Sequence, residues 1–133
     1  MFTKRITCVL IEDEPLAIEM MEDYIGRRDD LILLVVGSEL SEVKPILDKY
    51  KPSIIFLDLV IPPGECGGFH LGQIPPDISV VVVSATPLNH FRGKLPAHEL
   101  YELPKPVSYE SFDRCVNEVL KKRPQYCDAN KLS

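Results

Sequence analysis

The sequence predicts an α/β fold in which a five-stranded parallel sheet is covered by helices on both faces. Short apolar runs rich in β-branched residues alternate with helical patterns along the chain, which is typical of βαβ units. The middle runs are continuously apolar, as in strands that are buried from both sides. With 133 residues, the chain has the length of one domain. We therefore expect a single domain over residues 1–123 and a C-terminal tail or linker stub over residues 124–133, where periodicity is absent.

The five strand-like runs cover residues 6–11, 31–36, 54–57, 80–83 and 100–103. The first four are dominated by valine, isoleucine and leucine, and the last run is weaker. Pro104 directly follows the last run, and a proline in this place is tolerated if the strand lies at the edge of the sheet.

Three stretches between and after these runs have the helical spacing of apolar residues. The first covers residues 15–27, the second is capped by Ser41, and the third is capped by Ser108. Residues 62–76 and 87–96 either hold many prolines and glycines or have a broken pattern, so we expect both regions to be rich in loops.

Composition and charge exclude several classes of function. The net charge of -5 and the pI near 5.2 argue against nucleic acid as a direct partner, because phosphate binding requires a concentrated basic face. No apolar run approaches the roughly 20 residues of a membrane span, and the amino terminus lacks the pattern of a secretion signal. The four cysteines are scattered without the spacing of a zinc site, which favours a reducing compartment. We expect a cytoplasmic protein with no membrane partner.

Polar residues at the ends of the predicted strands are the candidates for chemistry, because ligands of parallel α/β sheets bind beyond the carboxyl ends of the strands. Glu12 and Asp13 follow the first strand and Asp58 follows the third, so these carboxylates converge if the two strands are neighbours. Converging carboxylates suit Mg²⁺, which takes oxygen ligands. Ser84 ends the fourth strand and Lys105 follows the fifth, and both side chains can bind phosphoryl oxygens. Together, these residues predict phosphoryl transfer to Asp58.

Each of these residues has a simpler structural explanation when it is taken alone. Carboxylates favour the N-terminus of any helix, a serine after a strand is often a turn residue, and lysines are mostly surface residues. The functional interpretation depends on their combination.

Four sequence blocks resemble the signature blocks of the CheY-like receiver domains of two-component response regulators. The blocks are Leu-Ile-Glu-Asp-Glu-Pro at residues 10–15, Phe-Leu-Asp-Leu at residues 56–59, Val-Ser-Ala at residues 83–85 and Lys-Pro at residues 105–106. They occur in the order and at the spacing of that family and together span nearly the whole chain. The resemblance implies a flavodoxin-like doubly wound sheet with strand order 2-1-3-4-5, and it implies that residues 1–123 form a receiver domain.

The resemblance also implies a role for each candidate residue. Asp58 would accept a phosphoryl group from a sensor histidine kinase in a Mg²⁺-dependent reaction, and Ser84 and Lys105 would contact that group. The chain would be a switch and not an enzyme, since its only catalysis would be its own phosphorylation and dephosphorylation. The family has a cis peptide bond between Lys105 and Pro106. The implied Mg²⁺ ligands are Glu12, Asp13, Asp58 and the backbone carbonyl of Val60.

Two segments that overlap these blocks, residues 13–17 and 105–112, are most similar to the LytTR-type regulators within this family. Such proteins carry a C-terminal DNA-binding output domain, which would lie outside the present residues. The resemblance also allows a homodimer through the face of the fourth helix of the family.

Two alternatives stay open beside the phosphorylated switch. Receivers usually have an aromatic residue three positions before the lysine, where this chain has Glu102. This departure supports a receiver-fold protein-interaction module that works without phosphorylation. The other alternative is a hydrolase with an aspartyl nucleophile, but that class requires a second carboxylate two positions after the nucleophile, where this chain has Val60.

Overall fold

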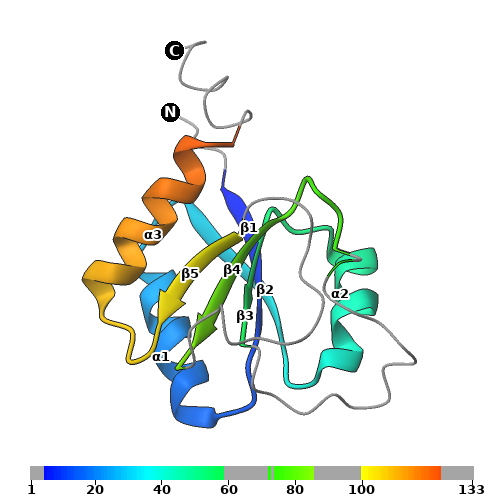
Figure 1. Cartoon of the computed structure of the whole chain (residues 1–133), viewed down its shortest axis with the longest axis horizontal. Coiled ribbons are helices and arrows are strands. Elements are labelled where there is room, and N and C mark those ends of the chain that lie inside the picture. The colour runs from blue at the N-terminus through cyan, green and yellow to red at the C-terminus, as the bar shows by residue number, and fades with distance from the viewer. Residues whose placement is uncertain (1–4, 59–71, 73, 86–99, 124–133) are drawn as a thin grey trace.

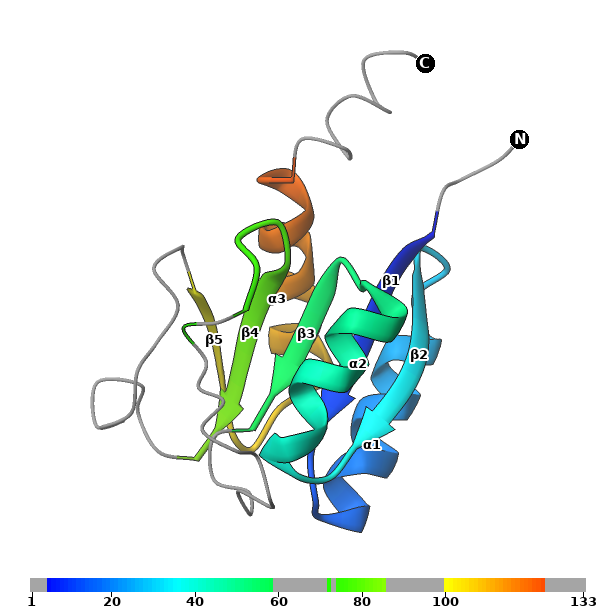
Figure 2. The same cartoon turned by 90° about the vertical axis from the view of Figure 1, so that its right-hand side faces the viewer.

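A computed structural model of the chain describes residues 5–58, 72, 74–85 and 100–123. Its centre is a parallel sheet, and the strands are drawn as arrows in Figure 1. The strands are β1 Ile6–Ile11, β2 Leu31–Gly37, β3 Ile54–Leu57, β4 Ser79–Ser84 and β5 Leu100–Pro104. Their order across the sheet is β2-β1-β3-β4-β5 (Figure 2), which confirms the predicted topology and places β5, with Pro104, at an edge.

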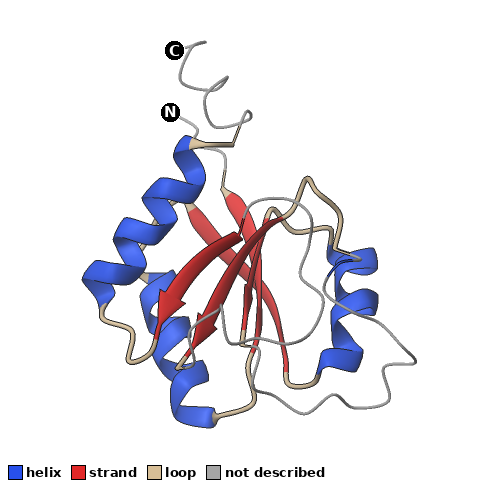
Figure 3. Ribbon diagram, in the orientation of Figure 1, coloured by secondary structure: helices blue, strands red, loops and turns tan. Residues whose placement is uncertain are grey.

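The described residues form three α-helices, which cover the two faces of the sheet. They are α1 Pro15–Gly26, α2 Val43–Tyr50 and α3 Tyr109–Lys121. Helices α1 and α3 lie on one face and α2 lies on the other (Figure 3), as predicted for a doubly wound sheet. Of these described helices, α3 is the longest at 13 residues, far too short for a bilayer span.

Two apolar cores result from the alternation of side chains along each strand. In β1, Cys8 and Leu10 join the core under α1 and α3, whereas Val9 and Ile11 join the core under α2. All four side chains are at most 1% exposed, so β1 is buried from both sides. Its continuous apolar sequence is therefore a consequence of its central position.

The predicted cap of the third helix is confirmed, and that of the second is wrong. Ser108 accepts a hydrogen bond from the backbone N–H of Ser111 at 3.1 Å and begins α3. Ser41 caps no helix, because a short 3-10 turn, Leu40–Glu42, precedes α2. The Glu42 carboxylate accepts the backbone N–H groups of Ser38 and Glu39 at 2.8 and 3.0 Å and so caps this turn, whereas α2 begins without a side-chain cap.

Gly37 lets the end of β2 approach the residues around it. A methyl group at this position would lie 2.9 Å from Ile46 Cδ1 and 3.0 Å from Ile11 Cδ1. We expect Gly37→Ala to lower the free energy of unfolding by about 1–3 kcal/mol through overpacking, as measured by urea denaturation. Gly26→Ala is the control, because nothing lies within 4 Å of a methyl group there. Equal stability of the two variants would show that the Gly37 site can relax.

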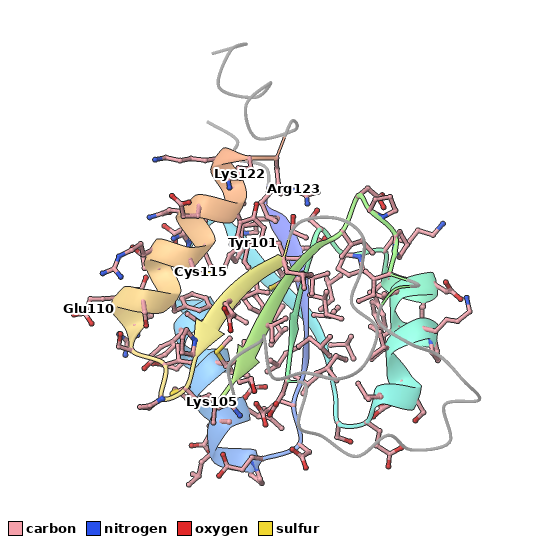
Figure 4. All side chains as sticks on the ribbon, viewed as in Figure 1. Tyr101, Lys105, Glu110, Cys115, Lys122 and Arg123 are labelled. Carbon is pink, nitrogen blue, oxygen red and sulfur yellow. The ribbon has the colours of Figure 1, made fainter. Side chains whose placement is uncertain are left out.

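Arg123 joins the end of α3 to the amino ends of two strands. Its Nη1 donates hydrogen bonds of 2.9 Å to the Ser53 carbonyl and to Ser79 Oγ. Ser53 immediately precedes β3, and Ser79 is the first residue of β4. Arg123 therefore lies at the amino ends of the strands, whereas Lys105 lies at the carboxyl ends, as Figure 4 shows.

Several predictions concern residues outside the described part of the chain. They include the Val60 carbonyl as a metal ligand, most of the two regions predicted to be rich in loops, and the tail over residues 124–133. Residues 74–76 are described and form neither helix nor strand, as expected.

Candidate functional site

The carboxyl ends of four strands bring the predicted residues to one edge of the sheet. Glu12 follows β1, Asp58 follows β3, Ser84 ends β4 and Lys105 follows β5. Figure 4 shows Lys105 just beyond β5, near the first turn of α1. Glu12, Asp58 and Ser84 are only 1%, 4% and 7% exposed. Buried carboxylates require partners, because an unpaired buried charge is strongly destabilising.

Lys105 is the partner of both buried carboxylates. Its Nζ lies 3.0 Å from Glu12 Oε1 and 2.9 Å from Asp58 Oδ2. The lysine side chain is 24% exposed, so one side of it still faces solvent. One ammonium group therefore bridges the ends of β1 and β3 from a loop that follows the edge strand.

Backbone hydrogen bonds fix the segments that carry these side chains. The N–H of Glu12 donates to the Gly37 carbonyl at 2.9 Å, and the N–H of Asp58 donates to the Ile11 carbonyl at 3.0 Å. The N–H of Lys105 donates to the Ser84 carbonyl at 3.1 Å. These bonds continue the sheet pattern beyond the strands, so the site is built on the rigid part of the fold. The bond between Lys105 and Pro106 is cis, as the resemblance implies.

Three carboxylates at this edge fit a divalent cation. One oxygen atom from each of Glu12, Asp13 and Asp58 lies within 4.8 Å of the other two. Glu12 and Asp58 are buried, whereas Asp13 is exposed and open to water. Mg²⁺ binds a few carboxylate oxygens and keeps several waters, so a site with one open side suits its chemistry.

Burial and pairing act in opposite directions on the charges of the site. Burial raises the pKa of Glu12 and outweighs the hydrogen bond from Lys105, which lowers it, while the nearby Asp58 raises it further. Burial works against the charge of Lys105, but the hydrogen bonds to Asp58 and Glu12 outweigh it and raise the pKa of the lysine. Lys105 therefore stays protonated and Glu12 binds a proton more readily than usual.

The raised pKa of Glu12 predicts a measurable pH dependence of stability. Above the ordinary value of 4.5, the folded chain holds a proton on Glu12 more tightly than the unfolded chain does. This residue therefore lowers the free energy of unfolding as the pH rises from 4.5 through its folded pKa. In urea titrations without Mg²⁺ between pH 5 and 7, Glu12→Gln should make the slope of unfolding free energy against pH more positive. Glu19→Gln, which changes an exposed side chain of α1, is the control, and a slope shared by both variants would contradict the assignment.

An apolar groove beside Lys105 was not predicted from the sequence. It has a volume of about 370 Å³, and its lining includes Leu16, Met20, Pro106 and Val107 as well as Lys105. Leu16 is 71% exposed, although Ala17, Met21 and Ile25 of the same helix are buried. The sequence contains one signal for this groove: Leu16, in the first turn of α1, does not share the helical spacing of the buried residues Ala17, Met21 and Ile25.

Comparisons with known proteins point to a single group. No protein-family model matches the chain. An uncharacterized response regulatory protein of Shewanella oneidensis is 27% identical over 118 residues, which are 87% of this chain and 49% of that protein. The transcriptional regulatory protein MalR of Bacillus subtilis is 24% identical over 132 residues, covering 96% of this chain and 56% of MalR. The chain thus spans about half the length of these curated relatives.

Solved structures show the same fold. The REC domain of the PhyR response regulator of Erythrobacter litoralis matches with a TM-score of 0.70 and 21% identity, covering 91% of this chain and 94% of that domain. The response regulatory domain of mrkE of Klebsiella pneumoniae matches with a TM-score of 0.68 and 18% identity, covering 90% of this chain and 98% of that domain. At these identities, the structural matches establish the architecture.

Proposed function

We propose that this chain, whose fold and similarities support a response-regulator receiver domain, is a phosphoryl-accepting switch with Asp58 as its acceptor and Mg²⁺ as its cofactor. The observation that carries the proposal is the bridge from Lys105 Nζ to Glu12 and Asp58, with Asp13 close by. This arrangement supports the proposal, because Asp58 would serve as the nucleophile, Lys105 as a positive charge and the three carboxylates as oxygen ligands for a metal.

The chemistry of these groups matches phosphoryl transfer. A carboxylate oxygen of Asp58 forms a bond to phosphorus while the bond between phosphorus and the donor breaks, and the leaving group takes the electron pair. Lys105 keeps its proton and pairs with the charge on the phosphoryl oxygens. The Ser84 hydroxyl, at the end of the neighbouring strand, donates to one of those oxygens. Hydrolysis by water restores the carboxylate, so the chain is a switch rather than an enzyme.

Glu12, Asp13 and Asp58 would hold the metal, and the Val60 carbonyl is an additional proposed ligand. When bound, Mg²⁺ neutralises carboxylate charge and withdraws charge from the phosphoryl oxygens.

The direct test is the intact mass of the chain after incubation with Mg²⁺ and a small acyl phosphate. We expect a labile gain of one phosphoryl group, and chelation of the metal should prevent it. No gain with several small donors, together with no Mg²⁺ binding in calorimetry, would contradict the proposal. That result would favour the interaction module that works without phosphorylation.

The proposed physiological donor is a sensor histidine kinase, and the apolar groove is the proposed contact for it. A phosphohistidine on a protein can reach Asp58 only if the donor covers the rim of the site, where Leu16, Met20 and Pro106 lie. An exposed apolar rim of this kind suits a protein surface better than a small molecule.

Leu16→Asp separates these two kinds of donor. We expect phosphorylation by small acyl phosphates to change less than twofold, and transfer from phosphorylated histidine kinases to slow on the order of tenfold, as for an interface residue of modest energy. A panel of purified kinases provides the protein donors. Equal rates for the variant and the natural chain with every kinase would exclude the groove as the contact.

The finer assignments are also proposals. Residues 13–17 and 105–112 support a LytTR-type regulator, in which a DNA-binding output domain follows the receiver over residues 1–123. A cytoplasmic location agrees with the reducing environment inferred from the cysteines. A homodimer is proposed on the resemblance alone, and analytical ultracentrifugation of the phosphorylated chain would test it.

A further inference from the structure

Tyr24 joins α1 to the loop that carries Lys105. Its hydroxyl donates a hydrogen bond to the Val107 carbonyl at 2.9 Å, across 83 positions in the sequence. Val107 is only two residues after Lys105, and its own side chain is 4% exposed. The helix that follows the acidic residues of the site therefore also holds the loop that supplies the cation.

The loop is fixed at its other points as well. At its start, the N–H of Lys105 donates to the Ser84 carbonyl, and at its end Ser108 caps α3. Val107 lies between these two anchors, and its backbone carbonyl is bound to α1 by the Tyr24 hydroxyl. A shift of this short loop would move the base of the lysine side chain directly.

The Tyr24 ring is itself held in place by its surroundings. Its centroid is 5.5 Å from that of Tyr109 in an edge arrangement and 5.7 Å from that of Phe112. The guanidinium carbon of Arg27 lies 5.5 Å from the Tyr24 centroid and 4.9 Å from the Tyr109 centroid. Packing of this kind fixes the direction of the hydroxyl, as the support of a functional group requires.

We infer that Tyr24 is a positioning residue for Lys105, which it acts on through the Val107 carbonyl. The inference rests on the proposed phosphorylation of Asp58. Lys105 Nζ has to keep two distances near 3 Å, to Glu12 and to Asp58, from a loop on a different part of the fold. Without the hydroxyl, the ring still fills its place beside the core, but the loop loses its hydrogen bond from α1.

Tyr24→Phe tests this role, with Tyr109→Phe as the matched control. Tyr109 belongs to the same aromatic group, but its hydroxyl donates to Asp113 Oδ1 of α3 at 3.5 Å and not to the backbone of the lysine loop. At saturating Mg²⁺ and acyl phosphate, well below the melting temperature of each variant, Tyr24→Phe should slow phosphorylation on the order of tenfold, the scale of a modest misplacement. Tyr109→Phe should stay within twofold of the natural chain.

Two further measurements distinguish positioning from general stability. In the Lys105→Met background, Tyr24→Phe should cause no additional loss of rate, because its effect passes through the lysine. In the unphosphorylated chain, the ¹⁵N signal of the Lys105 ammonium, identified by its loss in Lys105→Met, should weaken in Tyr24→Phe and persist in Tyr109→Phe.

The possible results separate the inference from the proposed function. A normal rate and an unchanged lysine signal in Tyr24→Phe would overturn the positioning role. Equal losses in both tyrosine variants would overturn it too, since they would reflect the aromatic packing. If the natural chain takes no phosphoryl group but the lysine signal responds as expected, the proposed function fails and the positioning of Lys105 by Tyr24 stands.

Discussion

Asp58→Asn will take up no phosphoryl group from any donor, protein or small molecule. The amide keeps the shape of the buried side chain but lacks the negative oxygen that attacks phosphorus. Lys105 retains Glu12 as a partner at 3.0 Å, so we expect the variant to fold. The measurement is intact mass over time with Mg²⁺ and an acyl phosphate, with circular dichroism as the test of folding.

Asp48→Asn is the control for this variant. Asp48 is an exposed carboxylate of α2 that pairs with Lys44 at 3.4 Å, and it lies beside Pro52 and Ile78, which precede β3 and β4, at the end of these strands opposite Asp58. It should become phosphorylated at the rate of the natural chain. A full phosphoryl gain in Asp58→Asn would mean that another carboxylate is the acceptor. Peptide mapping after reduction of the acyl phosphate would identify that residue.

Lys105→Met will slow phosphorylation by about 10²–10³-fold, the usual loss when one group that stabilises developing charge is removed. Methionine preserves most of the length of the side chain and removes its charge. Mg²⁺ should bind more tightly to the variant, because the ammonium no longer competes for the Glu12 and Asp58 oxygens. Rates from intact mass and Mg²⁺ titrations by calorimetry test the two expectations separately.

The opposite directions of these two effects make the experiment decisive. Lys44→Met, on the exposed face of α2, should change neither rate nor Mg²⁺ affinity. If Lys105→Met is phosphorylated at the normal rate, the Lys105 ammonium has no role in the chemistry. Weaker Mg²⁺ binding in Lys105→Met would mean that the lysine supports the metal site instead of competing with it.

The strands could be predicted because each one is a separate apolar run, whereas their order across the sheet was implied by the family resemblance. The position of Asp58 followed from the same pattern, since it ends a run of four buried residues. The apolar pattern does not predict the different surroundings of Glu12 and Asp13. Both are acidic and adjacent, yet the first is buried and paired with Lys105 while the second is exposed.

The cap of α2 was mispredicted because the chain forms a 3-10 turn, Leu40–Glu42, between β2 and the helix. Ser41 lies inside this turn, where its hydroxyl donates to the Glu39 carboxylate, and α2 begins without a side-chain cap. The bond from Tyr24 to Val107 could not be predicted either. It depends on the packing of α1 beside the loop after β5, and the helical pattern of Tyr24 is equally satisfied by an ordinary core residue.

The contacts of Arg123 determine where the polypeptide leaves the domain. This residue binds the amino ends of β3 and β4, whereas Asp58 and Ser84 lie at their carboxyl ends. A strand of six residues such as β4 is roughly 20 Å long. Arg123 therefore lies at the end of the sheet opposite Asp58 and Ser84. Within the described residues, a structural change at Asp58 or Ser84 would reach Arg123 through β3 and β4, the strands that join these two ends of the sheet.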